Sequence, residues 1–228
     1  MLNSKQLRLK ARESLKGKYW KAFWVSIVTG IIYSLGVSCI SFGESVSQIL
    51  TMVKPEEMDF TMKLGAQVIA GIAIVSLAIG LILDIFVGSP ILIGSCNYYI
   101  KNTYSNPSFG SAFAPFKVRY GRNIWTMLVM GIKLSLWTLL FVVPGIIKIY
   151  EYSIIPYILA DDAEISTKDA FKKARAMMKG NKWRLFKLEF SFIGWMLLCV
   201  LTLGIGTFFL TPYIEAATAE FYAELKNK

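Results

Sequence analysis

One thirteen-residue phrase occurs twice in the chain, as ARESLKGKYWKAF at residues 11–23 and as ARAMMKGNKWRLF at residues 174–186. The copies share Ala, Arg, Lys, Gly, Trp, a basic residue and Phe at identical spacing, and an apolar stretch follows each copy. Self-similarity of this kind indicates a repeated supersecondary unit. We therefore interpret the phrase as the entry to a repeated element of structure.

Long apolar runs lie at residues 22–42, 64–87, 124–147 and 185–210. Each run reaches or approaches the roughly 20 residues that a helix needs to cross a bilayer. The composition agrees, because 55 % of the 228 residues are hydrophobic and only 18 % are charged, against about 25 % charged residues in a soluble domain. The sequence predicts a membrane protein that crosses the bilayer several times. Its long, charged N-terminus is unlike a cleavable signal, so we expect the first span to be retained.

A third unit lies between the two copies of the phrase. Trp125 follows a basic stretch, and Pro156 lies 31 positions after it. In the last unit Pro212 lies 29 positions after Trp183, and in the first unit the second apolar run ends at Pro90. Each unit is thus predicted to be a transmembrane hairpin whose second helix carries a proline. The alternative is that Lys-Gly-Trp clusters recur by chance at membrane interfaces.

The predicted fold is an all-α integral membrane protein with six transmembrane helices, arranged as three pseudo-repeated helical hairpins plus amphipathic interfacial helices. It forms a single membrane domain over residues 1–228. Repeat 1 covers about 4–101, repeat 2 about 108–162 and repeat 3 about 166–226. A polar loop at roughly 43–63 makes the first repeat longer than the other two.

The charge distribution predicts the topology. Seven basic residues and one acid lie in segment 1–21, four basic residues and no acid in 101–122, and seven basic residues and four acids in 161–184. Segment 43–63 instead carries four acids and two lysines. Because Lys and Arg concentrate in cytoplasmic loops, both termini are expected in the cytoplasm. We attribute the net charge of +10 to contact with anionic lipid headgroups on that side rather than with nucleic acid.

Residues 164–180 predict an amphipathic helix with both ends marked. Ser166 is the expected N-cap and Gly180 follows the last turn. We expect this helix to lie in the cytoplasmic interface with its apolar face toward the lipid. It acts either as a lipid sensor or partner dock, or only as a brace for the hairpins. The interfacial or lipid-facing candidates in the whole chain are Trp20, Trp125, Trp183, Lys172, Lys173, Arg175 and Lys179.

Ionisable residues within the apolar spans are functional candidates because charge is costly at bilayer depth. Asp84 lies on a stripe of small residues with Ser76, Gly80 and Gly88, so another helix is expected to pack there. The charges either form a polar pathway, with Asp84 or Glu151 paired to Lys133 or Lys148, or only fix the helix register. The intramembrane polar candidates are Asp84, Lys133, Lys148, Glu151, Glu189 and Glu215.

The sequence provides no recognisable catalytic site. It contains no histidine, the commonest general base and metal ligand. Cys39, Cys96 and Cys199 lie in apolar stretches without metal-ligand spacing, so we expect small buried side chains there. No nucleophile elbow, P-loop or zinc-protease motif is present. We therefore expect no enzyme activity, no catalytic residue, no metal site and no cofactor.

Several strings resemble a family of small bacterial multi-pass membrane proteins known as domain of unknown function 975. The most specific are IYEYSIIPYILADD at 149–162 and the pair MKGNKW and FIGW within 178–195. The resemblance spans nearly the whole chain and implies a protein of the bacterial cytoplasmic membrane. It implies no activity, so no site residue is carried over from it.

These observations predict a non-enzymatic scaffold or accessory protein that engages lipid or a membrane partner. The partner is anionic lipid on the cytoplasmic side, with a membrane protein or a second copy of the chain as further candidates. The alternative is a small transporter or channel that uses the intramembrane charges, and an intramembrane enzyme comes third. A lipid-like molecule held between hairpins would favour amphiphile binding.

Overall fold

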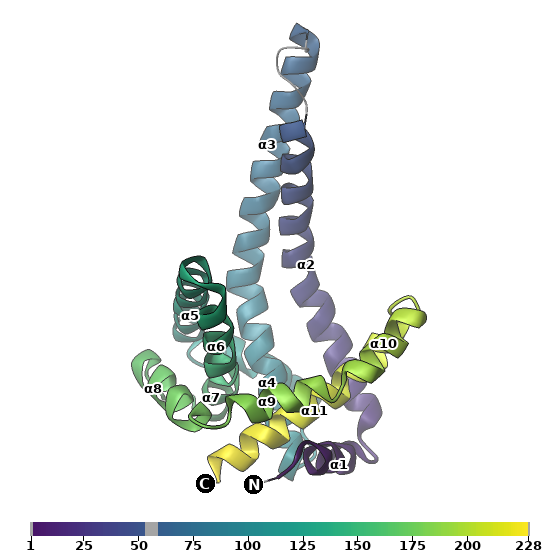
Figure 1. Ribbon diagram of the computed structural model, residues 1–228, viewed down its shortest axis with the longest axis vertical. Coiled ribbons are helices and arrows are strands. Elements are labelled where there is room, and N and C mark those ends of the chain that lie inside the picture. The colour runs from purple at the N-terminus through teal and green to yellow at the C-terminus, as the bar shows by residue number, and fades with distance from the viewer. Residues whose placement is uncertain (1, 53–58, 228) are drawn as a thin grey trace. The chain divides into compact units, whose positions relative to one another are not determined.

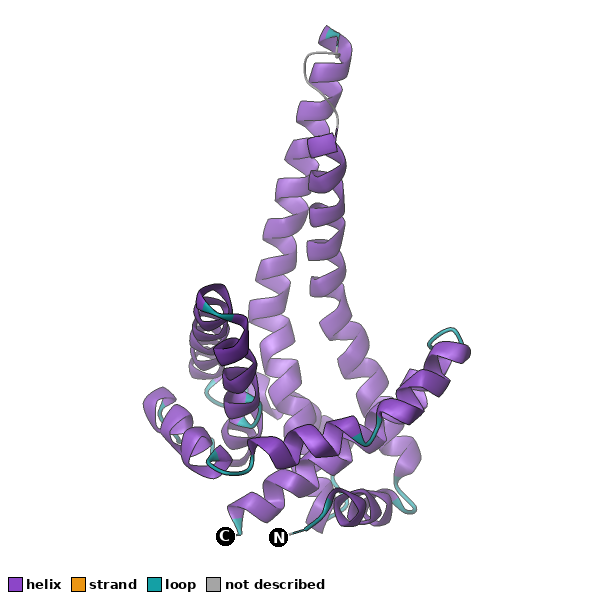
Figure 2. Cartoon of the chain, in the orientation of Figure 1, coloured by secondary structure: helices purple, strands orange, loops and turns teal. Residues whose placement is uncertain are grey.

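The computed structural model describes residues 2–52 and 59–227. The chain is 86 % helix, and no strand occurs among the described residues (Figure 2). It forms two compact units, one from Met1–Thr29 with Pro90–Lys228 and one from Gly30–Ser89 (Figure 1). The fold class is therefore all-α, as predicted.

Most of the helices belong to the first unit. They are α1 (Ser4–Leu15), the start of α2 (Tyr19–Met52), α4 (Ser89–Tyr104), η3 (Phe109–Phe116), α5 (Tyr120–Leu140), α6 (Val142–Tyr152), α7 (Ile155–Asp161), α8 (Thr167–Met178), α9 (Lys182–Phe190), α10 (Ile193–Leu201) and α11 (Ile205–Lys226). The second unit holds the remainder of α2 together with α3 (Phe60–Leu83) and the short π-helix η2 (Asp84–Gly88).

The second unit is a close pair of helices. A Cβ on Gly80 of α3 would lie 2.8 Å from the backbone nitrogen of Ile40 and 2.9 Å from the carbonyl oxygen of Gly36, both on α2. Ser76 Oγ donates a hydrogen bond of 2.8 Å to the carbonyl oxygen of Cys39. The predicted stripe of small residues on α3 is confirmed as a packing face, because small side chains let two backbones approach closely.

Pro90 explains the π-helix that precedes α4. Proline has no N–H to donate and its ring crowds the preceding turn, so regular α-helical bonding is interrupted there. The chain accommodates this with a wider turn, in which the N–H of Ser89 donates to the carbonyl oxygen of Asp84, five residues earlier. Such single-turn insertions are the usual form of π-helix within α-helices.

The core of the first unit lies where the C-terminal parts of the hairpins meet the amphipathic helices. Leu7, Ala11 and Leu15 of α1 are at most 4 % exposed, and α1 packs on α11. Tyr99 of α4 is also buried, and its hydroxyl lies 2.6 Å from Ser26 Oγ. Burial at intervals of three to four residues is what the amphipathic pattern of α1 predicts.

The two copies of the thirteen-residue phrase have the same local structure. In each, an amphipathic helix ends, a glycine with positive φ follows, and the next helix begins two residues later: Gly17 has φ of 74° and Gly180 has φ of 76°. Ser166 caps α8 as predicted, because its Oγ accepts from the N–H of Asp169 at 3.2 Å. The division of the whole chain into three repeats stays a prediction.

Within residues 2–52 and 59–227, four helical segments are long and apolar enough to cross a membrane: Tyr19–Met52, Phe60–Tyr104, Tyr120–Leu140 and Val142–Asp161. They indicate a membrane protein. The prediction of six spans is not met by these segments, because the apolar run at 185–210 is divided among α9, α10 and α11.

The helices also extend into the segment that was expected to be a polar loop. The loop was predicted at about 43–63, but α2 continues to Met52 and α3 begins at Phe60. Residues 44–52 contain neither glycine nor proline, so nothing in the sequence stops α2 at Gly43. Residues 53–58 lie outside the described part of the chain.

Candidate functional site

A large apolar pocket lies in the first unit between α1 and the hairpin formed by α10 and α11. Its volume is about 1100 Å³, slightly above the roughly 300–1,000 Å³ of most small-molecule sites. The sequence pattern explains each wall: α1 is amphipathic, and the hairpin is uncharged from residue 190 to residue 214. The walls are lined mainly by Leu9, Leu15, Tyr19, Trp195, Leu198, Phe209, Leu210 and Tyr213.

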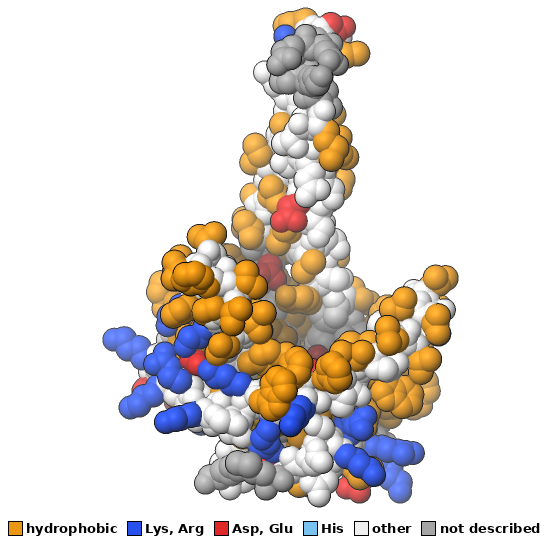
Figure 3. All heavy atoms as spheres, in the orientation of Figure 1, with side chains coloured by type: hydrophobic (Ala, Val, Ile, Leu, Met, Phe, Trp, Pro, Cys, Tyr) orange, Lys and Arg blue, Asp and Glu red, His pale blue; other side chains and the backbone are white. Residues whose placement is uncertain are grey.

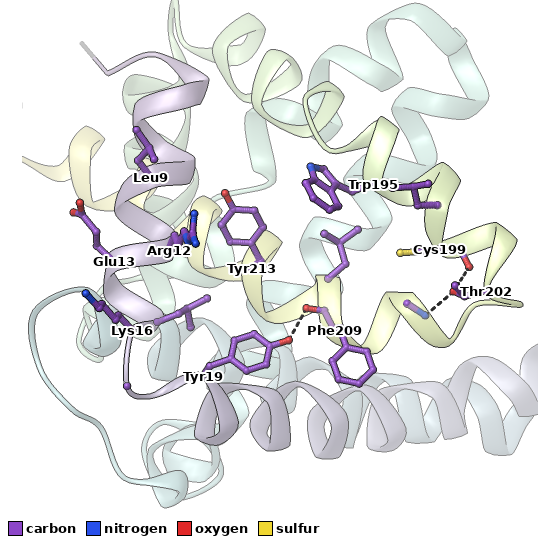
Figure 4. Close-up of a pocket in the computed structure, with 15 residues that line it drawn as sticks. Leu9, Arg12, Glu13, Lys16, Tyr19, Trp195, Cys199, Thr202, Phe209 and Tyr213 are labelled. Carbon is purple, nitrogen blue, oxygen red and sulfur yellow. Dashed lines mark hydrogen bonds between the residues drawn. The ribbon is translucent and has the colours of Figure 1, made fainter.

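Two tyrosine hydroxyls connect the walls of the pocket. Tyr19, at the start of α2, donates to the carbonyl oxygen of Phe209 on α11 at 2.9 Å (Figure 4). Tyr213 of α11 donates to the carbonyl oxygen of Arg8 on α1 at 3.1 Å. Each hydroxyl therefore donates to a backbone carbonyl oxygen, and the two aromatic rings remain available to contact a ligand.

The pocket has a charged rim on one side only. Arg12 and Glu13 of α1 and Lys16, the residue that follows α1, are exposed, and Figure 4 shows them across the pocket from Trp195 and Cys199 of α10. Two cations against one carboxylate leave this rim positive. The opposite wall is apolar, with Trp195, Leu198 and Phe209 each about half exposed.

This arrangement suits a molecule with an apolar body and an anionic end. The apolar walls would bury hydrocarbon, which is favourable by about 25 cal/mol per Å². The guanidinium of Arg12 can bind a phosphate or carboxylate in a bidentate manner, and Lys16 can add a point charge. Among the described residues, no group of three His, Cys, Asp or Glu side chains could hold a metal ion.

Glu151 is the centre of a second polar cluster. Its side chain is only 6 % exposed, and Lys148 Nζ lies 2.6 Å and Lys182 Nζ 2.5 Å from its carboxylate oxygens. Arg175 Nε, from α8, lies 3.3 Å away. Hydrogen bonds to Tyr152 and Glu151 raise the pKa of Arg175. The predicted Lys148–Glu151 pair is thus present, and two cations from α8 and α9 join it.

The other predicted intramembrane residues of the first unit also contact neighbouring helices. Lys133 Nζ lies 3.7 Å from the centre of the Phe171 ring on α8. Glu189 accepts a hydrogen bond of 2.9 Å from the hydroxyl of Tyr150. Glu215 accepts one of 2.6 Å from Ser95 Oγ on α4. These contacts tie the hairpins to one another and to α8, as expected of groups that fix helix positions.

Asp84 belongs to the second unit, where it is half-buried at the start of η2. A Cβ on Gly36 of α2 would lie 3.0 Å from the backbone nitrogen of Asp84, so this turn of the stripe faces α2 as expected. The pairing of Asp84 with Lys133 or Lys148 stays a prediction, because those lysines belong to the other unit.

The predicted interfacial residues are largely on the surface. Trp20, Trp125 and Trp183 are 65 %, 59 % and 62 % exposed. On α8, Lys172, Arg175 and Lys179 are exposed and Lys173 is half-buried. Basic side chains gather over α8 and near α1 in Figure 3, beside the orange apolar surface of the hairpins.

The expected orientation of α8 needs a correction. Its apolar face was predicted to face lipid, but Ala170, Phe171, Ala174 and Met178 are at most 6 % exposed. The helix packs on α6 and α7. Contact with protein removes this apolar face from water just as contact with lipid would, so the amphipathic pattern is compatible with either. The contacts favour the bracing role of α8 over a role as a lipid-facing sensor.

The pocket residues were not singled out from the sequence. Arg12 and Lys16 belong to the repeated phrase, Arg12 in the last turn of α1 and Lys16 directly after it. Aromatic residues flank the Gly204–Gly206 break in the last apolar run. Neither pattern predicts that α1 and this hairpin lie side by side, because the two segments are separated by about 180 residues of sequence.

The comparisons with known proteins concern the C-terminal part of the chain. Residues 140–228 match the family described as "Protein of unknown function (DUF975)". This segment runs from the end of α5 through α11. No curated protein and no solved structure matches the chain.

Proposed function

We propose that this chain, whose residues 140–228 match the DUF975 family, is a non-enzymatic membrane accessory protein that binds one anionic amphiphile. The ligand is a lipid whose acyl part lies in the pocket between α1 and the α10–α11 hairpin. The observation that carries the proposal is the one-sided rim of Arg12, Glu13 and Lys16, which is positive on balance, beside the apolar walls of a pocket of about 1100 Å³.

The positions of the remaining charges support binding rather than transport. Glu151 is enclosed by Lys148, Arg175 and Lys182, and Lys133 lies over Phe171. Removing one partner from such a cluster leaves an uncompensated charge, which costs about 3–5 kcal/mol when the group is buried. Groups held this way are suited to fixing helix positions.

Exposed tryptophans and basic side chains support placement at a membrane surface. Trp20, Trp125 and Trp183 have the exposed, amphipathic rings that concentrate at headgroup depth. The exposed Lys172 of α8 and Lys179, which follows it, add positive charge in the same unit, and positive charge attracts anionic lipid. We propose that this surface faces the cytoplasm, where both termini would lie.

The test compares charge reversals at the pocket with equal reversals elsewhere. The double variant Arg12→Glu, Lys16→Glu changes the rim, while Lys172→Glu, Lys179→Glu makes the same change on α8. Each variant is purified in native lipid, and native mass spectrometry measures what remains bound. At about 1 kcal/mol per basic residue removed, the rim variant should lose the lipid bound in the pocket by a factor of roughly thirty or more. The α8 variant should retain that lipid, because Lys172 and Lys179 do not line the pocket. Equal retention by both variants, or no bound lipid in the unsubstituted chain, would contradict the proposal.

A further inference from the structure

The hairpin of α10 and α11 is apolar, exposed and short. The chain carries no charge from residue 190 to residue 214, and a turn at 202–204 divides this stretch near its middle. The most exposed side chains lie at the turn: Val200 is 70 %, Leu201 80 % and Leu203 94 % exposed. A contiguous apolar surface of this kind marks a membrane or protein contact.

The length of the hairpin decides how far it can enter a bilayer. The nine residues of α10, Ile193–Leu201, rise about 13 Å at about 1.5 Å per residue. Residues 205–214 of α11 rise about 15 Å. The hydrocarbon core of a bilayer is about 30 Å thick, so each leg matches about one leaflet and neither can cross both.

The base of the hairpin is fixed by protein contacts. From Pro212 onward, α11 is largely buried in the core of the first unit, with Ala216, Ala217 and Ala219 at most 2 % exposed. Before α10, α9 carries three basic residues: Lys187 is exposed, and Lys182 and Arg184 are held in ion pairs with Glu151 and Glu224. A longer apolar hairpin would have to include α9 or the end of α11. Both segments carry charged residues, and placing these in hydrocarbon is costly.

The turn is closed by its own hydrogen bonds. The N–H groups of Thr202, Leu203 and Gly204 donate to the carbonyl oxygens of Cys199 and Val200 at 2.9–3.2 Å. The next three N–H groups, from residues 205 to 207, donate to Thr202 O, Thr202 Oγ1 and Gly204 O at 3.0–3.1 Å. A turn in hydrocarbon must satisfy its backbone donors internally, because no water is there to do so.

We propose that the α10–α11 hairpin enters one leaflet of the bilayer and turns back near the midplane. Its occupant is the acyl-chain region of that leaflet, and the pocket runs along the same hairpin, from Tyr213 near its base to Thr202 in its turn. This gives the last two helices of the chain a re-entrant path in place of the two predicted spans. The inference does not depend on the pocket's binding a lipid.

Spin labels test the depth. Leu203→Cys places a label at the turn, and Lys187→Cys places a control label on the exposed basic surface of α9. The unsubstituted chain, with Cys39, Cys96 and Cys199, is the blank for background labelling. The protein is reconstituted in liposomes of phosphatidylglycerol and phosphatidylethanolamine, and the spin-relaxation rate of each label is measured. Oxygen, which dissolves in the bilayer, should increase the relaxation rate of the label at 203, and a water-soluble nickel chelate should not. The label at 187 should show the reverse.

Thiol modification in sealed vesicles provides a second test, which does not depend on a calibrated depth of the label in the bilayer. A membrane-impermeant thiol reagent applied from either face should fail to modify Leu203→Cys and should modify it after detergent is added. Modification from the face opposite Lys187→Cys would show a crossing hairpin and overturn the proposal. Modification from the same face, at the rate seen for Lys187→Cys, would show a hairpin outside the membrane and would also overturn it.

Discussion

The ammonium group of Lys133 lies 3.7 Å from the centre of the Phe171 ring. This contact joins α5, an apolar helix, to α8, whose outer surface is basic. A cation over an aromatic ring is attracted by the ring quadrupole, most strongly where water is scarce. The contact therefore explains how a lysine within an apolar run is accommodated, since no carboxylate of the described residues forms an ion pair with Lys133.

The first prediction concerns this pair. Lys133→Met and Phe171→Leu, made singly and together, should show a coupling free energy of about 0.5–2 kcal/mol in unfolding measurements. The exposed Lys172→Met on α8 is the control and should show no coupling to Phe171→Leu. If the effects of Lys133→Met and Phe171→Leu simply add, the contact does not contribute to stability.

The second prediction concerns the Glu151 cluster. Glu151→Gln leaves Lys148 and Lys182 without the carboxylate that they share, so the unfolding free energy should fall by about 3–5 kcal/mol. Combining it with Lys182→Gln should cost less than the sum of the single changes, because the double variant removes one uncompensated charge. Thermal unfolding in detergent measures all three. Strict additivity would show that the cluster is not coupled.

The third prediction concerns a close backbone approach in the first unit, between Gly94 and Ala112. A Cβ on Gly94 of α4 would overlap the carbonyl oxygen of Ala112 in η3, and neither backbone can move aside easily. Gly94→Ala should therefore destabilise the protein by at least about 3 kcal/mol. Gly121→Ala is the matched control, because a Cβ there meets nothing within 4 Å. Similar melting temperatures for the two variants would contradict this packing.

The fourth prediction concerns pH and the start of α3. Asp59 caps this helix, and the hydrogen bond from the N–H of Met62 lowers the pKa of its carboxyl group below the usual value. Because the folded pKa is the lower one, the carboxylate stabilises the cap fully above about pH 3.9 and loses this effect as pH falls through the folded pKa. NMR titration should place the pKa below 3.9, with loss of Met62 amide protection over the same range.

Asp59→Asn provides the control for that titration. An asparagine side chain keeps an oxygen that can accept from Met62 but does not titrate in this range. Its Met62 amide should keep its protection as the pH falls. An Asp59 pKa at or above the usual value would show that the cap bond does not persist in solution.

Local signals in the sequence were sufficient for several parts of the fold. Ser166 and Gly180 mark the ends of α8 because a cap and a positive-φ glycine are required by the backbone of the helix termini. Ser76 and Gly80 marked the face of α3 that packs on α2, because close helix packing needs small side chains. These features depend on residues within a few turns of one another.

Features that depend on distant contacts were not visible in the sequence. The apolar face of α8 has the same sequence pattern whether it contacts lipid or protein. The positions of Phe171 and Met178 in the sequence therefore did not predict that α8 packs on α6 and α7. Likewise, hydropathy at 185–210 does not distinguish one crossing helix from a short hairpin. The pocket requires α1 to lie beside α10 and α11, which no pattern within either segment specifies.

The most direct test of amphiphile binding is to map where a bound lipid lies. A phosphatidylglycerol analogue with a photoreactive group on its acyl chain is incorporated into native-lipid particles, irradiated and located by peptide mass spectrometry. The account predicts crosslinks concentrated in residues 9–19 and 195–213, which line the pocket, and their loss in Arg12→Glu, Lys16→Glu. Crosslinks spread over all exposed apolar helices, and unchanged by that variant, would contradict a specific lipid site.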